Sequence, residues 1–109
     1  MIYQVREAKI HIVTRVKRGR AKAKVHVKDE TLGEAIMSDQ PLSTVSYAAS
    51  FTKGLPSYSS VKCDVHVSIP CENSHEARAK TFLRARKFVM VRLKKEMTTT
   101  MQELEDGIL

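Results

Sequence analysis

The sequence predicts an α+β fold, in which two β-hairpins form one four-stranded antiparallel sheet and a long C-terminal helix covers one face, in the order ββββα. Three patterns support this prediction. Apolar residues alternate with polar ones over residues 45–71, and again over residues 8–28, with the period of two that is typical of half-buried strands. From residue 82 onward, apolar residues recur at every third or fourth position, as in an amphipathic helix.

The clearest strand signal lies in residues 61–69, where valine, cysteine and isoleucine at odd positions alternate with polar residues. Residues 45–51 carry a second apolar row at odd positions, and the GLPSYSS segment between the two rows is typical of a hairpin loop. We expect Phe51 to lie opposite Val61 across this hairpin. One face then becomes a continuous apolar patch that the helix covers.

Residues 8–28 predict another hairpin, because apolar residues occupy even positions before Arg18-Gly19 and odd positions after it. A two-residue turn with glycine in second place requires that switch. The implied register places Ile12 opposite Val25 and directs the apolar residues of the hairpin to one face.

The other face of this hairpin is predicted to be basic. The chain has a net charge of +7, and eight of its lysines and arginines lie between Lys9 and Lys28 with no acid among them. Like charges opposite each other destabilise a sheet, so a face made only of cations is not favourable for stability alone. We therefore prefer polyanion binding by counterion release to the alternative, a merely solvated surface. His11 and His26 would face each other there, and Tyr58 is an exposed candidate for base stacking. We predict nucleic-acid contacts from Lys9, Arg15, Lys17, Arg18, Arg20, Lys22, Lys24, His26, Lys28, Tyr58 and Lys62.

Residues 73–107 are predicted to form the covering helix, with Asn73 and Glu76 as a capping box. Residues 29–42 are expected to be a connector with a short helical turn. A six-residue strand spans only ~20 Å, so the helix either breaks near the threonines at 98–100 or overhangs its sheet. An overhang would bury its apolar residues on a second copy. The predicted oligomer interface is Val89, Leu93, Met97, Met101 and Leu104.

A chain of 109 residues is expected to form one domain, with the sheet within residues 2–71, the helix over 73–97 or longer and an acidic tail over 98–109. No apolar run reaches the ~18–20 residues that cross a bilayer, and the N-terminus lacks the pattern of a signal peptide, so we expect a cytoplasmic protein. Cys63 and Cys71 lie roughly 25 Å apart along one extended segment, too far for a disulfide.

The sequence contains no serine-hydrolase, zinc-protease, P-loop or dinucleotide-binding motif, so neither an enzymatic activity nor a cofactor is predicted. Lys62, Asp64 and His66 share one strand face, which is compatible with acid–base chemistry but is typical of a polar outer face. His11 and His26 have no third ligand nearby, so a metal site is not predicted.

The ββββα order with a basic sheet, over residues 8–97, resembles the PC4-like and Whirly single-stranded-DNA-binding modules. That resemblance implies oligomers formed through the helices and DNA strands bound on the sheets. The Tyr58-Ser59-Ser60 segment, the VKCDVHVSIPC strand and the following helix look like small bacteriophage proteins of unassigned function. The C-terminal MQELEDGIL is similar to the acidic tails by which bacterial and phage single-stranded-DNA-binding proteins recruit replication enzymes; a final helix turn packed on a neighbouring subunit is the alternative.

Together these features predict a phage-type homo-oligomer, a dimer or larger, that binds single-stranded DNA or RNA with little sequence preference, DNA being favoured. The acidic tail would recruit a replication or host protein, and no membrane partner is expected. The alternative is an oligomeric interaction or inhibitor protein whose basic face binds an acidic host protein or an anionic nucleotide.

Overall fold

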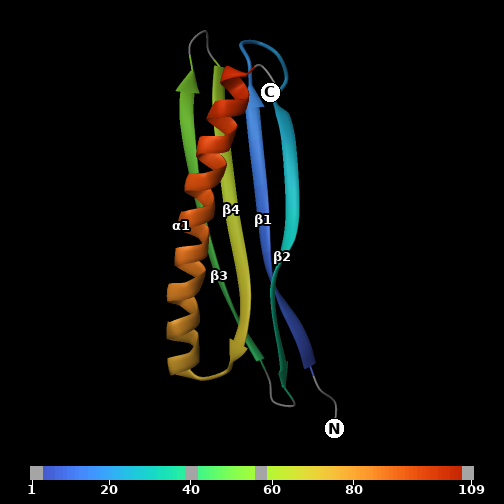
Figure 1. Cartoon of the computed structure of the whole chain (residues 1–109), viewed down its shortest axis with the longest axis vertical. Coiled ribbons are helices and arrows are strands. Elements are labelled where there is room, and N and C mark those ends of the chain that lie inside the picture. Colours follow the sequence, from blue (N-terminus) through green and yellow to red (C-terminus); the bar gives the residue numbers. More distant parts are fainter. Residues whose placement is uncertain (1–3, 39–41, 56–58, 107–109) are drawn as a thin grey trace.

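The structure, a computed structural model, describes residues 4–38, 42–55 and 59–106. It confirms the predicted α+β fold, with one four-stranded antiparallel sheet and one long C-terminal helix (Figure 1). The strand order is β2-β1-β4-β3, so the two hairpins join along β1 and β4. The elements are β1 (Gln4–Lys17), β2 (Lys24–Ser38), β3 (Leu42–Leu55), β4 (Ser59–Glu72) and α1 (His75–Glu105).

The strands are 14 or 15 residues long, more than twice the six-residue strand with which the helix length was compared above. The predicted connector over 29–42 is wrong, because β2 continues to Ser38 and β3 begins at Leu42. A strand of 14 residues spans roughly 46 Å, and the 31 residues of α1 span about the same length. The helix and the sheet are therefore similar in length, and α1 neither breaks at 98–100 nor overhangs the sheet. The molecule is a rod of 58 × 23 × 20 Å.

The core is a layer between one face of the sheet and α1. Odd residues of β4 over 61–71 and even residues of β1 over 8–16 are buried, as the period of two predicts. Ala85, Val89 and Leu93 of α1 cover them at the spacing of one helical turn. The two central strands thus supply most of the apolar face, and the helix closes it.

The register of β3 on β4 differs from the predicted one by two residues. Phe51 lies opposite Cys63, so the predicted pairing of Phe51 with Val61 is wrong. A shift of two keeps every side chain on its face, and the predicted apolar row still points to the helix. Tyr47 of this row meets Phe82 of α1 edge to face, with 5.7 Å between ring centroids.

The helix begins one residue later than the predicted capping box. Ser74 is the N-cap, and its hydroxyl accepts a hydrogen bond from the backbone N–H of Ala77 at 3.1 Å. Asn73 instead accepts hydrogen bonds from Ser43 of β3 and from Arg78. Serine and asparagine are both favoured N-caps. Which of two such neighbours caps the helix depends here on the tertiary contact between Asn73 and β3.

Candidate nucleic-acid interface

The β1–β2 hairpin, which carries most of the predicted contacts, pairs in an unexpected register. Ile12 lies opposite Lys28, so the predicted pairing of Ile12 with Val25 is wrong. The chain reverses through the six-residue segment 18–23 instead of a two-residue turn, and Gly19 supplies a positive φ of 56°. The resulting shift is three residues, and an odd shift turns every side chain of β2 to the opposite face.

The predicted single basic face is therefore not formed. Residues 24, 26 and 28 pair with the buried positions 16, 14 and 12 of β1, and so they share the helix side of the sheet. The open face carries Lys9, Arg15, Lys17 and Lys62. The β1–β2 loop contains Arg18, Arg20 and Lys22, and the helix side of β2 carries Lys24, His26 and Lys28. The last predicted contact, Tyr58, lies outside the described residues.

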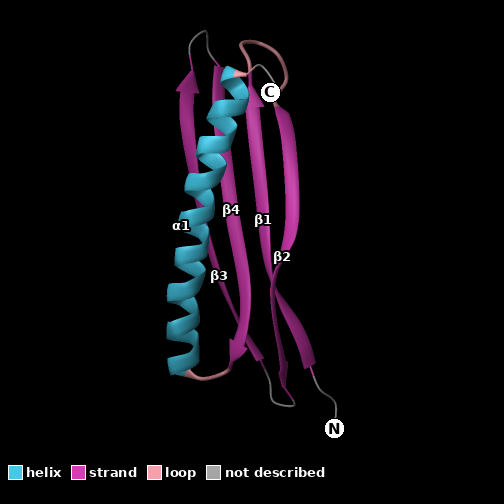
Figure 2. Cartoon of the chain, viewed as in Figure 1, coloured by secondary structure: helices cyan, strands magenta, loops and turns pink. Residues whose placement is uncertain are grey.

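The cations near this loop nevertheless remain accessible from both sides. The helix packs over β3 and β4 (Figure 2), and Lys24 and Lys28 on the helix side of β2 stay exposed. We define the basic end as Arg15, Lys17, Arg18, Arg20, Lys22, Lys24 and Lys28. Among the residues that the structure describes, none of these seven side chains has an ion-pair partner.

The open face of the sheet is mixed in character. Lys62 lies 4.0 Å from the carboxylate of Asp64. Val25 and Val27, which the sequence pattern assigned to the core, are 52% and 54% exposed on this face. The open face, which includes Arg15 and Lys17 of the basic end, thus also carries acidic and apolar side chains.

The histidines do not form the predicted cross-strand pair. His11 pairs through Nδ1 with Asp29 of β2 and lies opposite His66 of β4, whereas His26 lies opposite Thr14 on the other side of the sheet. Over the described ranges, no three histidine, cysteine or acidic side chains group closely enough to hold a metal ion. Of the histidines at 11, 26 and 66, only His26 lies beside the basic end, between Lys24 and Lys28 on the helix side of β2.

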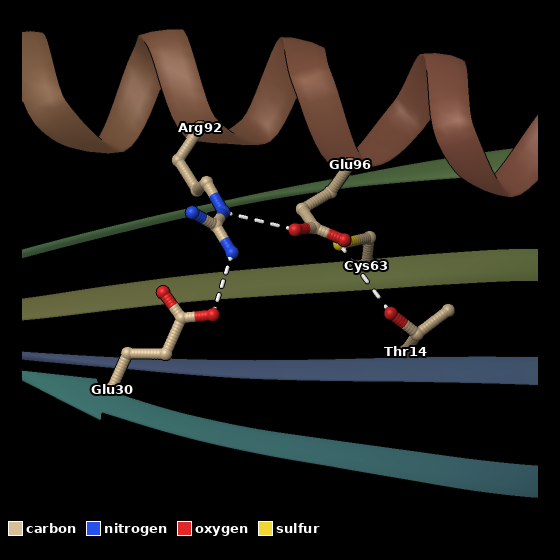
Figure 3. Close-up of polar contacts among 5 residues, drawn as sticks. All are labelled: Thr14, Glu30, Cys63, Arg92 and Glu96. Carbon is tan, nitrogen blue, oxygen red and sulfur yellow. Dashed lines mark hydrogen bonds and ion pairs between the residues drawn. The ribbon is translucent and has the colours of Figure 1, made fainter.

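A cluster of polar side chains links α1 to β2, an edge strand of the sheet (Figure 3). Arg92 donates from Nε to buried Glu96 and from Nη2 to Glu30 of β2, each at 2.9 Å. Beneath Glu96, the hydroxyl of Thr14 donates to the Sγ of Cys63 at 3.8 Å. Sequence reasoning missed this cluster, although the four-residue spacing of Arg92 and Glu96 is that of a helical ion pair. Through Arg92 the cluster links the helix to β2.

Burial raises the pKa of the Cys63 thiol above its ordinary value of 9.0, and the nearby Glu96 adds to the rise, while the hydrogen bond from Thr14 opposes it. Above pH 9 the unfolded chain loses this proton and the folded chain retains it, so stability falls as pH rises. We expect Cys63→Val to remove this pH-dependent loss in the free energy of unfolding. The loss is at most about 1.4 kcal/mol at one pH unit above 9. Urea unfolding of both chains on either side of pH 9 measures it. Parallel pH profiles would contradict the expectation.

Two of the five predicted interface residues are used inside the chain. Val89 and Leu93 are 0% and 9% exposed and pack on their own sheet, so they are not accessible to a second copy. Met97 is exposed, and Met101 and Leu104 are half-buried. The exposed apolar residues of α1 that the sequence did not single out for an interface are Phe82, Leu83, Phe88, Met90 and Val91.

The acidic segment is largely helical, because α1 continues through Glu105. It ends at the same end of the molecule as the β1–β2 loop (Figure 1). Residues 107–109 lie outside the described part of the chain, and the recruiting role of the segment stays a prediction.

Comparisons with protein-family models, with curated proteins and with solved structures find no match to this chain. The resemblances to phage proteins and to PC4-like and Whirly modules therefore stay predictions. Among the described residues, no helix combines the length and the apolar content needed to cross a bilayer.

Proposed function

We propose that this protein binds single-stranded nucleic acid, with DNA as the first candidate and with little sequence preference, through the basic end. The observation that supports this is the group of seven exposed cations without ion-pair partners in the described chain, on a hairpin with no acid from residue 8 to 28. Lysines and arginines that are not neutralised by the protein are free to replace the counterions condensed on a phosphate backbone.

The two-sided placement of these cations favours a single strand over a duplex. A flexible strand is able to pass from the open face, around the loop, to the helix side of β2, whereas a stiff duplex contacts one side at a time. Only six aromatic residues exist in the chain, and Tyr47 and Phe82 pack on each other. Phosphate contacts therefore dominate over stacking and base recognition. We place the protein in a cytoplasm, where Cys63 and Cys71 remain free thiols.

Fluorescence anisotropy with a labelled thymidine oligonucleotide tests this function. If all seven cations contact phosphates, at about 0.7 released counterions each, the logarithm of the association constant falls with the logarithm of salt concentration with a slope of about −5. We expect a hairpin duplex of equal length to bind more weakly. No binding at about 50 mM salt, or an affinity that does not change with salt, would remove this function.

The variant Arg18→Glu/Arg20→Glu is expected to weaken binding about tenfold or more and to reduce the salt slope by about 1.4, since two contacts are lost. Lys87→Glu/Lys95→Glu is the matched control, because it makes the same change in net charge at exposed positions of α1. An equal loss in both variants would mean that only overall charge matters. Retention of an acidic host protein after nuclease treatment would favour the interaction-protein alternative.

A further inference from the structure

An exposed apolar stripe runs along one flank of α1. Leu83, Met90 and Met97 are 64%, 49% and 39% exposed, and Leu104 continues the series as a half-buried residue. These four residues, which we call the outer stripe, are spaced seven apart. A seven-residue apolar repeat is the pattern by which two helices pack side by side along their length.

The outer stripe lies apart from the side of α1 that serves the protein's own core. At 100° per residue, Met90 is rotated by about 100° from the buried Val89. Arg92, on the other flank of the buried row, reaches Glu30 and so marks the flank that faces β2. The outer stripe therefore lies on the flank of α1 that is turned away from β2. The basic end does not cover this flank.

The charges of α1 are separated along its length. Eight lysines and arginines lie between residues 78 and 95, and Glu103, Glu105 and Asp106 follow without a base in the last turn. Acids at the C-terminus of a helix oppose its macrodipole, so this end is unfavourable for an isolated helix. The basic end lies at the same end of the molecule, but in the described chain its cations form no ion pair with these acids. Cations from a second molecule, placed next to these acids, would therefore relieve the conflict.

We propose that two copies of this chain pack α1 against α1 in antiparallel orientation along the outer stripe. Leu83 then meets Leu104 of the partner subunit, and Met90 meets Met97 of the partner subunit, about a two-fold axis. In this register Glu105 lies beside Lys80 of the partner subunit. A parallel pair would instead set each charged segment against its own copy. Methionine adapts its shape to such a contact.

An anionic membrane is a less suitable occupant of the stripe. Cations flank its first half, but the stripe continues into the acidic end of α1, which an anionic surface repels. An antiparallel second copy suits both halves of the stripe, because it places its acidic end beside the cations and its cations beside the acidic end. Dimerisation in this geometry does not depend on nucleic-acid binding, and it would place the two basic ends at opposite ends of the dimer.

Sedimentation analysis without nucleic acid tests the contact. The wild-type chain is expected to be a dimer, and Met90→Glu is expected to be a monomer because it places a charge in the centre of the stripe. Val91→Glu is the matched control: Val91 is adjacent and 62% exposed but points to another side of the helix, so this variant stays dimeric. Circular dichroism checks that both variants are folded. A monomeric wild type, or equal dissociation of both variants, would overturn the proposal.

The orientation is tested by exchanging charges. Lys80→Glu and Glu105→Lys are each expected to weaken self-association about fivefold, since each puts like charges together at both ends of the dimer. Mixing the two variants is expected to restore wild-type affinity as a heterodimer. In a parallel dimer each variant would associate as tightly as wild type, which would overturn the antiparallel arrangement. Binding of the wild type to vesicles of anionic lipid, with no dimer in solution, would show the membrane to be the occupant.

Discussion

Replacing Arg92 with methionine is expected to lower the free energy of unfolding by about 3 kcal/mol. The guanidinium joins Glu96 of the helix to Glu30 of β2, at 2.9 Å to each carboxylate. The side chain of Glu96 is only 8% exposed, so without Arg92 its charge stays buried with no partner. Glu30 is 43% exposed and regains water, which is why we attribute the cost mainly to Glu96. Urea unfolding at neutral pH measures the change.

The double variant Arg92→Met/Glu96→Met is the control for this interpretation. It removes the buried carboxylate together with its partner, and apolar replacements of both members of such a pair are often nearly neutral. We therefore expect the double variant to be more stable than Arg92→Met alone. A double variant that is no more stable than Arg92→Met alone would show that the unpaired buried charge of Glu96 is not the cause of the loss.

Replacing Ile12 with alanine is expected to cost about 2–5 kcal/mol, whereas Val27→Ala is expected to change stability by no more than about 0.5 kcal/mol. Ile12 is 1% exposed beneath the helix, and Val27 is 54% exposed on the open face of the same hairpin. The comparison tests the β1–β2 register directly. In the register that the sequence pattern suggests, the valines of β2 would lie in the core beside Ile12 and their truncation would leave a cavity.

Ile12→Val provides a graded control, with an expected loss of about 0.5–1.5 kcal/mol. Guanidinium unfolding of the four chains, with similar denaturant slopes, measures all differences on one scale. If Val27→Ala lost as much as Ile12→Ala, the three-residue shift in the hairpin and the two-sided placement of the cations would both be contradicted.

The sequence was sufficient for the identity of the strands and the helix, but not for the β1–β2 register. In β4 one row is apolar and the other polar, so the period of two also shows which row is buried. In β2 the valines at 25 and 27 suggest one face, yet they lie outside, because this strand is at the edge of the sheet and α1 does not cover it. Edge strands tolerate lysine toward the covered side and valine toward solvent.

The turn and the strand ends were equally ambiguous. Segment RGRAKA contains one glycine and suits either a two-residue turn or the observed loop over 18–23. The second half of β2, ETLGEAIMS, does not alternate and includes Gly33, which is why it was predicted as a connector. The positions of the candidate contacts depended on these two features, so their residue types were predictable from the sequence but their common surface was not.

The central ladder between β1 and β4 has a consequence for how the chain reaches its native state. It joins residues 43 positions apart at Lys17 and Ser60, and 59 apart at Lys9 and Ser68. Contacts this distant in sequence form slowly, and β4 leaves the ribosome only after more than half of the chain has been made. During that interval β1 and β2 have no cover, and we expect the dense positive charge of residues 9–28 to oppose pairing between nascent hairpins.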